Sequence, residues 1–123
     1  MGVIICVDRF ASLVRSTFSG RLTIEDVVEA RDRTIAQAQP PMTLRHLIDL
    51  RAVSHVDFEE RDLDELARLP SIFAAGALQV VVAHEGSPII GVVRMFQAAA
   101  RTSARNVHLV DDLAKAHALL GLP

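Results

Sequence analysis

The feature that most constrains this chain is an apolar run from Ala77 to His84, which contains three consecutive valines. β-Branched residues favour extended backbone, and a strand with apolar residues at successive positions buries both of its faces. Such a strand needs covering elements on both sides of its sheet. The run therefore predicts a central strand in the mostly parallel sheet of an α/β domain.

Four other segments have the composition of strands. Two of them, Val3–Val7 and Leu13–Phe18, are joined by a short turn and predict an antiparallel hairpin. Leu44–Leu50 has the apolar density of a buried strand, which would place Asp49 near its carboxyl end. A last short strand is predicted over Asn106–Val110.

Two helices are predicted before the central run. The first extends from Ile24 to about Ala38, and the hydroxyl of Thr23 can cap its N-terminus. The second covers Asp57–Leu69. The side chains expected to face inward from these helices are Ile24, Val27, Val28, Ile35, Ala38, Leu63, Leu66 and Ala67.

Two more helices follow the central run. Gly86-Ser87-Pro88 combines a turn residue, an N-cap and a first-turn proline, so it opens the third helix. Asp111-Asp112 caps the fourth helix, which Gly121 ends. The side chains expected to face inward are Ile89, Val92, Val93, Phe96, Ala99, Ala100, Leu113, Ala116 and Leu120.

The resulting order of elements is β-β-α-β-α-β-α-β-α. Strands separated by helices imply right-handed crossovers and parallel pairing. We therefore predict one domain over residues 1–123, since 123 residues is an ordinary domain length. Its fold class is α/β, with a five-stranded mostly parallel sheet, an antiparallel N-terminal hairpin and about four helices.

Three segments resemble the SpoIIAA-like (STAS) domains. Leu47–Asp57 is similar to their strand-loop-helix signature, Gly20–Asp26 matches their strand-to-helix junction, and Asp112–Leu120 looks like their terminal helix. The resemblance covers nearly the whole chain and implies a SpoIIAA-like fold. That fold is also similar to the CRAL-TRIO lipid-transfer domains.

The chain departs from these domains at their phosphorylation site. Bacterial anti-sigma-factor antagonists with this fold carry Asp-Ser-Ser-Gly at the helix start and are phosphorylated on the second Ser. The matching residues here are Asp57-Phe58-Glu59-Glu60, so the chain resembles a divergent branch without the phosphoacceptor. Glu59 either imitates a permanent negative charge or simply caps the helix, and capping is the more common role. We expect Asp57, Phe58 and Glu59 to belong to an interaction surface.

Charge and composition disfavour several classes of partner. Thirteen Lys and Arg against fifteen Asp and Glu give a formal net charge of -2, without an excess positive field for nucleic acid or anionic lipid. The single cysteine, Cys6, lies in an apolar strand and cannot form an internal disulfide, which fits a reducing compartment. No stretch approaches the ~20 apolar residues of a membrane span. We expect a bacterial cytoplasmic protein.

Ligands of open parallel sheets bind outside the carboxyl ends of the strands. This rule selects six candidate ligand-binding residues: Asp49, Arg51, His84, Gly86, Ser87 and Arg94. The free N–H groups at the start of the third helix could hold an anion such as phosphate or carboxylate. The alternative is purely structural, with Ser87 as a cap, Asp49 paired with Arg51, and Arg94 in water. A cap without a ligand is the more common role of a Gly-Ser-Pro helix start.

The sequence has no convincing catalytic or metal-binding group. Its five histidines are scattered, and no pair has the i, i+4 spacing of a helical zinc site. Cys6 lies among apolar residues, which disfavours a Cys-His nucleophile. We therefore predict no enzymatic activity, no metal and no cofactor.

The third helix has more apolar residues than one buried stripe requires. We expect Ile90 and Met95 to be partly exposed, and either a second copy of the chain or a lipid-like ligand could cover them. The alternative is ordinary packing of this helix on the sheet within one copy. Together these features favour a non-enzymatic STAS-like regulatory or protein-interaction module that forms a homodimer. The alternative is a carrier or sensor of a small apolar or anionic ligand bound at the C-terminal edge of the sheet.

Overall fold

The structure is a computed structural model that describes residues 2–38, 44–69, 76–100 and 106–123. It has the predicted order of strands and helices. The strands are β1 (Gly2–Asp8), β2 (Leu13–Thr23), β3 (Arg45–Asp57), β4 (Leu78–Val82) and β5 (Asn106–Val110). The helices are α1 (Ile24–Ala38), α2 (Glu60–Arg68), α3 (Ile89–Ala100) and α4 (Leu113–Leu120).

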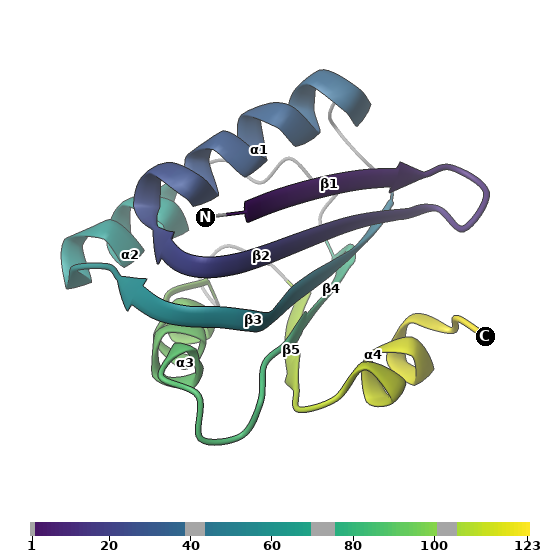
Figure 1. The fold of residues 1–123 in the computed structure, drawn as a ribbon. Coiled ribbons are helices and arrows are strands. Elements are labelled where there is room, and N and C mark those ends of the chain that lie inside the picture. Colours follow the sequence, from purple (N-terminus) through teal and green to yellow (C-terminus); the bar gives the residue numbers. More distant parts are fainter. Residues whose placement is uncertain (1, 39–43, 70–75, 101–105) are drawn as a thin grey trace.

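The five strands form one sheet in the order β1-β2-β3-β4-β5 (Figure 1). β1 and β2 pair antiparallel, and every other neighbouring pair is parallel. The predicted fold class is therefore confirmed, including the N-terminal hairpin. β4 is an interior strand, as expected, although β3 occupies the middle of the sheet.

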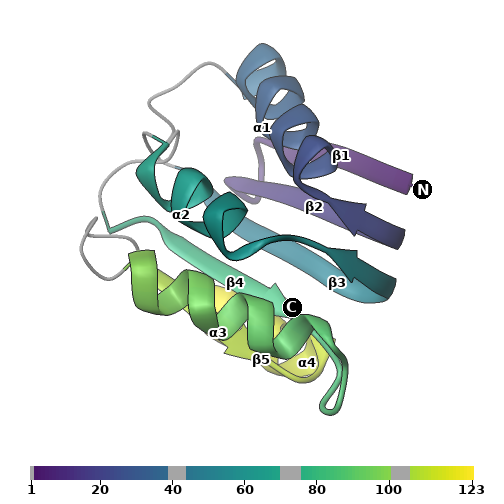
Figure 2. The same cartoon turned by 90° about the vertical axis from the view of Figure 1, so that its left-hand side faces the viewer.

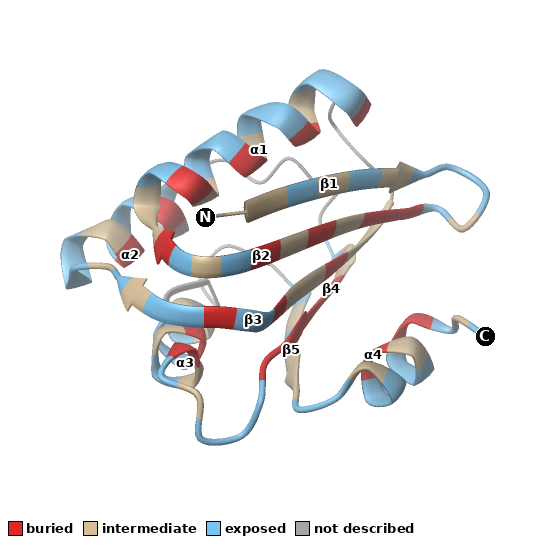
Figure 3. Cartoon of the chain, viewed as in Figure 1, coloured by how far each residue is buried: buried red, intermediate tan, exposed pale blue. Residues whose placement is uncertain are grey.

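Helices cover both faces of this sheet. α1, α2 and α3 lie on one face and α4 lies behind the other (Figure 2). Val81 belongs to the core cluster that includes Ile89 and Val93 of α3, whereas Val80 packs in the cluster with Leu120 of α4. Successive residues of β4 thus enter opposite cores, and Figure 3 shows β4 buried along most of its length. This is the two-sided burial that the valine run predicts.

Strands β2 and β3 extend further than the sequence pattern indicated. β2 continues past Phe18 through Gly20, whose φ is 74°, and β3 continues past Leu50. The two extensions pair with each other up to Thr23 and Asp57, with register shifts that mark β-bulges. The sequence pattern indicated connecting segments at these two extensions. Neither extension has the regular apolar pattern of a strand on its own.

Two predicted positions change as a result. Asp49 lies within β3 rather than near its carboxyl end, and Asp57 ends β3 rather than opening a helix. α2 begins at Glu60, with Glu59 as its N-cap. Arg21 of β2 forms an ion pair with Asp57 and so links the ends of the two extended strands.

The predicted start of α1 and both predicted ends of α4 are confirmed. Thr23 and Asp26 cap α1 reciprocally: the Thr23 N–H donates to Asp26 Oδ2 at 3.0 Å, and the Asp26 N–H donates to Thr23 Oγ1 at 3.3 Å. The Asp112 side chain accepts a hydrogen bond from the Lys115 N–H, and Gly121 ends α4 with a φ of 67°.

Two predictions about burial are wrong. Val28 is exposed, because α1 turns a stripe of small and polar residues centred on Ala30 and Thr34 toward the core. Cys6 is also exposed, because it lies on an edge strand, on the face that carries Ile4. The side chains of residues 67, 99 and 100 lie outside the described part of the chain. Among the helices that the structure describes, none has the length and apolar character needed to cross a bilayer.

Neighbouring leucines of α4 test whether this helix covers the second face. Leu120 is 2% exposed and Leu119 is 47% exposed. We expect Leu120→Ala to lower the free energy of unfolding by about 2–5 kcal/mol, because it leaves a cavity against β4. Leu119→Ala should cost about 1 kcal/mol or less. Urea denaturation of both variants measures the difference, and equal losses would contradict the placement of α4.

Candidate ligand-binding site

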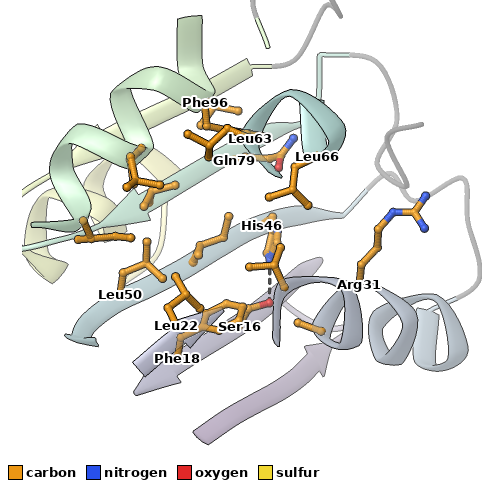
Figure 4. Close-up of a pocket in the computed structure, with 18 of the residues that line it drawn as sticks. Ser16, Phe18, Leu22, Arg31, His46, Leu50, Leu63, Leu66, Gln79 and Phe96 are labelled. Atoms are coloured by element: carbon orange, nitrogen blue, oxygen red, sulfur yellow. Dashed lines mark hydrogen bonds between the residues drawn. The ribbon is translucent and has the colours of Figure 1, made fainter. Parts of the chain in front are cut away.

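A cavity of about 210 Å³ lies between the sheet and the three helices of the first face. Strands β2, β3 and β4 form its floor, while α1, α2 and α3 form its walls (Figure 4). Most of its lining is aliphatic or aromatic, and includes Phe18, Leu50, Leu66, Val81, Ile89 and Phe96.

Helix packing explains why the space is left open. α1 contacts β1 and β2, whereas α2 packs against α3. The middle of the sheet lies between these two groups of helices. The side chain that α1 contributes there is the small one of Ala30. An apolar cavity of about 150 Å³ can bind benzene, and drug-sized pockets are roughly 300–1,000 Å³. The space therefore suits a single ring with a small substituent.

One end of the cavity is polar. Ser16, His46 and Gln79 come from three adjacent strands and line the same cavity. His46 and Gln79 are the second residues of β3 and β4 and lie opposite each other in the parallel register. The polar row, as we call these three residues, thus lies toward the amino ends of β3 and β4, whereas the predicted ligand site was at the carboxyl ends.

The polar row carries no net charge at neutral pH. Ser16 Oγ and His46 Nε2 are 2.8 Å apart, and the tautomer of His46 decides which of them donates. Burial away from water lowers the pKa of His46 to about 4, although a polar contact with Gln79 acts in the opposite direction. The imidazole is consequently neutral at pH 7.

α1 adds two polar side chains to the lining. The Thr34 hydroxyl donates to the Ala30 carbonyl at 2.7 Å, so its hydrogen bond lies within the helix. Arg31 is half-buried, and Figure 4 shows its guanidinium reaching away from the Ser16–His46 pair. The charged group of the lining therefore lies apart from the polar row.

The Ser16–His46 pair has the spacing of a nucleophile and its base, but its surroundings favour binding over catalysis. A base with a pKa of about 4 is weak at neutral pH. The strand backbone beside it is engaged in sheet pairing, so its N–H groups are not arranged as an oxyanion hole. Within the described residues there is also no group of three or more His, Cys, Asp or Glu side chains placed to hold a metal ion.

Comparison with solved structures finds the same architecture in an uncharacterized protein of the DUF3478 family from Shewanella loihica PV-4, which has a SpoIIAA-like fold. The TM-score is 0.55, and the match covers 97% of this chain and 94% of the other at 16% identity. This chain has a SpoIIAA-like fold. No protein-family model and no curated protein matches the chain. The fold resemblance is confirmed, while the similarity to CRAL-TRIO domains stays a prediction.

Within this SpoIIAA-like fold, three predicted ligand residues gather on the opposite side of the sheet from the cavity. Asp49 alternates with Ile48 and Leu50, which line the cavity, so its side chain faces the other way. It accepts hydrogen bonds from Arg51 Nε at 3.0 Å and Nη2 at 2.8 Å. These bonds lower the pKa of Asp49, and the charge of His84 contributes to the same direction. The local pairing of Asp49 with Arg51 is thus present.

The other three predicted ligand residues lie around the start of α3. Gly86 forms a turn with a φ of 82°, and Ser87 Oγ accepts a 3.4 Å hydrogen bond from the Ile89 N–H. Arg94 is exposed and lines a shallow hollow with Gly86 beside β5. The six residues therefore divide between two places and do not converge on the cavity.

The predicted interaction residues are also separated. Glu59 is the N-cap of α2: its N–H donates to Asp62 Oδ2 at 2.8 Å, and its carboxylate lies 2.8 Å from Arg61 Nε. Asp57 pairs with Arg21, whereas Phe58 is half-buried and lines the cavity. On α3, Met95 is exposed and Ile90 packs at the edge of the core.

Sequence reasoning missed the polar row. Each of its members interrupts an apolar strand, at Ser16 in Leu13–Phe18, His46 in Leu44–Leu50 and Gln79 in Ala77–His84. Strand alternation places each of them on the face that carries Phe18, Leu50 or Val81. Three polar residues on the buried face of adjacent strands are the signal that could have indicated this site.

The lowered pKa of His46 predicts how stability depends on pH. Between about pH 6.5 and pH 4 the unfolded chain takes up a proton at His46 that the folded chain does not, so folding loses stability as the pH falls. The loss from this residue approaches about 3 kcal/mol at the lower end of that window. We expect His46→Gln to lack this part of the pH dependence in urea denaturation at pH 7.5, 6, 5 and 4.

The matched control is His84→Gln, which removes an exposed histidine. It should retain the wild-type pH dependence. If His46→Gln and the wild type lose the same free energy of unfolding between pH 6.5 and pH 4, the conclusion that His46 is neutral in the folded protein is wrong.

Proposed function

We propose that this protein binds a small, largely apolar molecule in the cavity between the sheet and α1, α2 and α3, and acts as a carrier or sensor. The observation that carries the proposal is the partly open, mostly apolar space of about 210 Å³ with a polar row at one end. An apolar space with a few convergent polar groups is the usual form of a small-molecule site.

The lining of the cavity supports an occupant. Its apolar side chains lack van der Waals partners on the side that faces the space, which is partly open to solvent. A bound molecule restores the missing contacts, and its binding stabilises the folded state by mass action.

A role without catalysis follows from the same site. The weak base at His46 and the paired backbone around it are suited to holding a polar group rather than to activating Ser16. We therefore propose a ligand-binding module. Its proposed binding site is the helix-sheet cavity rather than the C-terminal edge of the sheet that the sequence indicated.

The probe for this proposal is toluene, which is small enough for the cavity and carries no charge. We expect saturable 1:1 binding by NMR or calorimetry, together with a rise in melting temperature. Ala30→Leu should reduce binding at least tenfold, because the larger side chain fills the space beside α1. It should leave the protein at least as stable as the wild type.

Ala36→Leu is the matched control, since Ala36 lies on the exposed face of the same helix. This variant should bind toluene like the wild type. Native mass spectra before and after mild denaturation add a readout of any retained ligand. If toluene shows no saturable binding, or if Ala30→Leu binds as well as Ala36→Leu, the cavity is not the site.

We propose a protein-interaction role as a second function, in which two copies of the chain meet through β1. The specific observation is that β1 is an edge strand of the described sheet and that its Ile4 side chain is 66% exposed. Cys6 is exposed on the same face. An edge strand with outward apolar residues is a template for pairing with another strand.

The homodimer has its own test. We expect sedimentation velocity to show a concentration-dependent dimer that Ile4→Lys weakens at least tenfold, because a charge at the edge strand opposes pairing. Ile4→Val keeps an apolar side chain there and should retain the dimer. A protein that stays monomeric at every concentration at which it remains in solution would refute this second proposal.

A further inference from the structure

The polar side chains at one end of the cavity are buried, which is unusual for residues of these types. Ser16 is 2% exposed and Gln79 is 9% exposed, and both lie on strands whose neighbouring cavity-facing residues are apolar. Burying a hydroxyl or an amide costs free energy unless hydrogen bonds compensate. Ser16 is hydrogen-bonded to His46 at 2.8 Å, Gln79 contacts the same imidazole, and both Ser16 and Gln79 line the cavity.

We propose that the polar row selects uncharged molecules that carry one hydrogen-bonding oxygen, such as a small phenol or alcohol, and orients that oxygen toward Ser16 and Gln79. This inference rests on the proposed ligand-binding function and specifies its chemical class. The apolar part of the molecule lies along the floor toward Leu50 and Phe18 (Figure 4).

The hydrogen-bonding inventory matches such an oxygen. A serine hydroxyl donates one hydrogen bond and accepts up to two, and a glutamine amide both donates and accepts. The bond between Ser16 and His46 uses one of these positions on the hydroxyl. The row can therefore donate to a ligand oxygen and accept from a ligand hydroxyl, which a hydrocarbon cannot exploit.

Charge distribution disfavours an ionised ligand at this end. A buried carboxylate or ammonium group needs an opposite charge close by. Ser16 and Gln79 are neutral side chains, and the His46 imidazole is uncharged at pH 7 because burial lowers its pKa. The guanidinium of Arg31 reaches away from the Ser16–His46 pair (Figure 4). This arrangement argues against the anionic part of the ligand class predicted from the sequence.

The dimensions fit a short amphiphile. His46 and Leu50 are four residues apart on β3, which is roughly 13 Å along an extended strand. Both residues line the cavity. A ring with its hydroxyl at the row can thus keep its apolar edge among the aliphatic side chains of the floor.

The experiment compares toluene with phenol, which replaces a methyl group by a hydroxyl group of similar size. Dissociation constants of both probes are measured at pH 7 for the wild type and for Ser16→Ala and Gln79→Leu. The ratio of the two constants within one protein is compared between proteins, because this comparison cancels the different hydration of the probes. We expect the preference for phenol over toluene to fall about tenfold in each variant, equivalent to 1.4 kcal/mol or one hydrogen bond.

Ile48→Val is the matched control, because Ile48 lies on the same strand as His46 and lines the cavity with an apolar side chain. It should weaken both probes equally and leave their ratio unchanged. Benzoate is the charged probe, and it should bind at least tenfold more weakly than phenol.

Each outcome bears on a different claim. Binding of toluene with an unchanged ratio in Ser16→Ala and Gln79→Leu overturns the role of the polar row and leaves the cavity as a ligand site. Tighter binding of benzoate than of phenol also overturns it, and assigns selectivity to Arg31. Failure of every probe to bind removes the ligand-binding function itself.

Discussion

The burial of β4 on both faces is the constraint on which the rest of the structure depends. Val80 and Val81 point into separate cores, so the sheet is stable only when helices cover it from both sides. α4 covers one side at β4 and β5, and three helices share the other. Because α1 packs over the hairpin while α2 packs on α3, the covering is incomplete above the middle of the sheet. The cavity is therefore a consequence of how five strands are covered by three helices.

The polar row makes one end of the cavity chemically different from the rest of its lining. A cavity lined only by aliphatic side chains would hold an apolar molecule in many orientations, whereas one polar end fixes which part of the molecule lies there. The same burial that removes water from His46 keeps its imidazole neutral, as the lowered pKa indicates. Neutrality in turn makes the row a hydrogen-bonding surface rather than a charged one. The hydrogen-bonding character of this end thus follows from the burial of His46.

The fold could be predicted from sequence to a large extent, whereas the cavity could not. Local patterns such as the valine run, Gly86-Ser87-Pro88 and the Thr23 cap decide where elements begin, and they place the elements in the observed order. The predicted ends of β2 and β3 are wrong, because the polar extensions of these strands are stabilised by pairing with each other. The cavity depends on the separation of α1 from α2, which no local pattern encodes. Asp49 and Arg51 were predicted from the rule that ligands bind outside the carboxyl ends of strands. Because β3 continues to Asp57, both residues lie in the middle of that strand.

The start of α2 connects the cavity to the segment that the sequence analysis compared with the phosphorylation site of the anti-sigma-factor antagonists. Here Glu59 caps α2 and pairs with Arg61, while its neighbour Phe58 lines the cavity. A molecule bound in the cavity would contact Phe58, one residue before the cap. Adjacent residues in this segment thus face different environments, with one carboxylate at the surface and one ring against the ligand space. In this chain the segment is thus tied to the lining of the cavity through Phe58, while the Glu59 carboxylate lies at the surface.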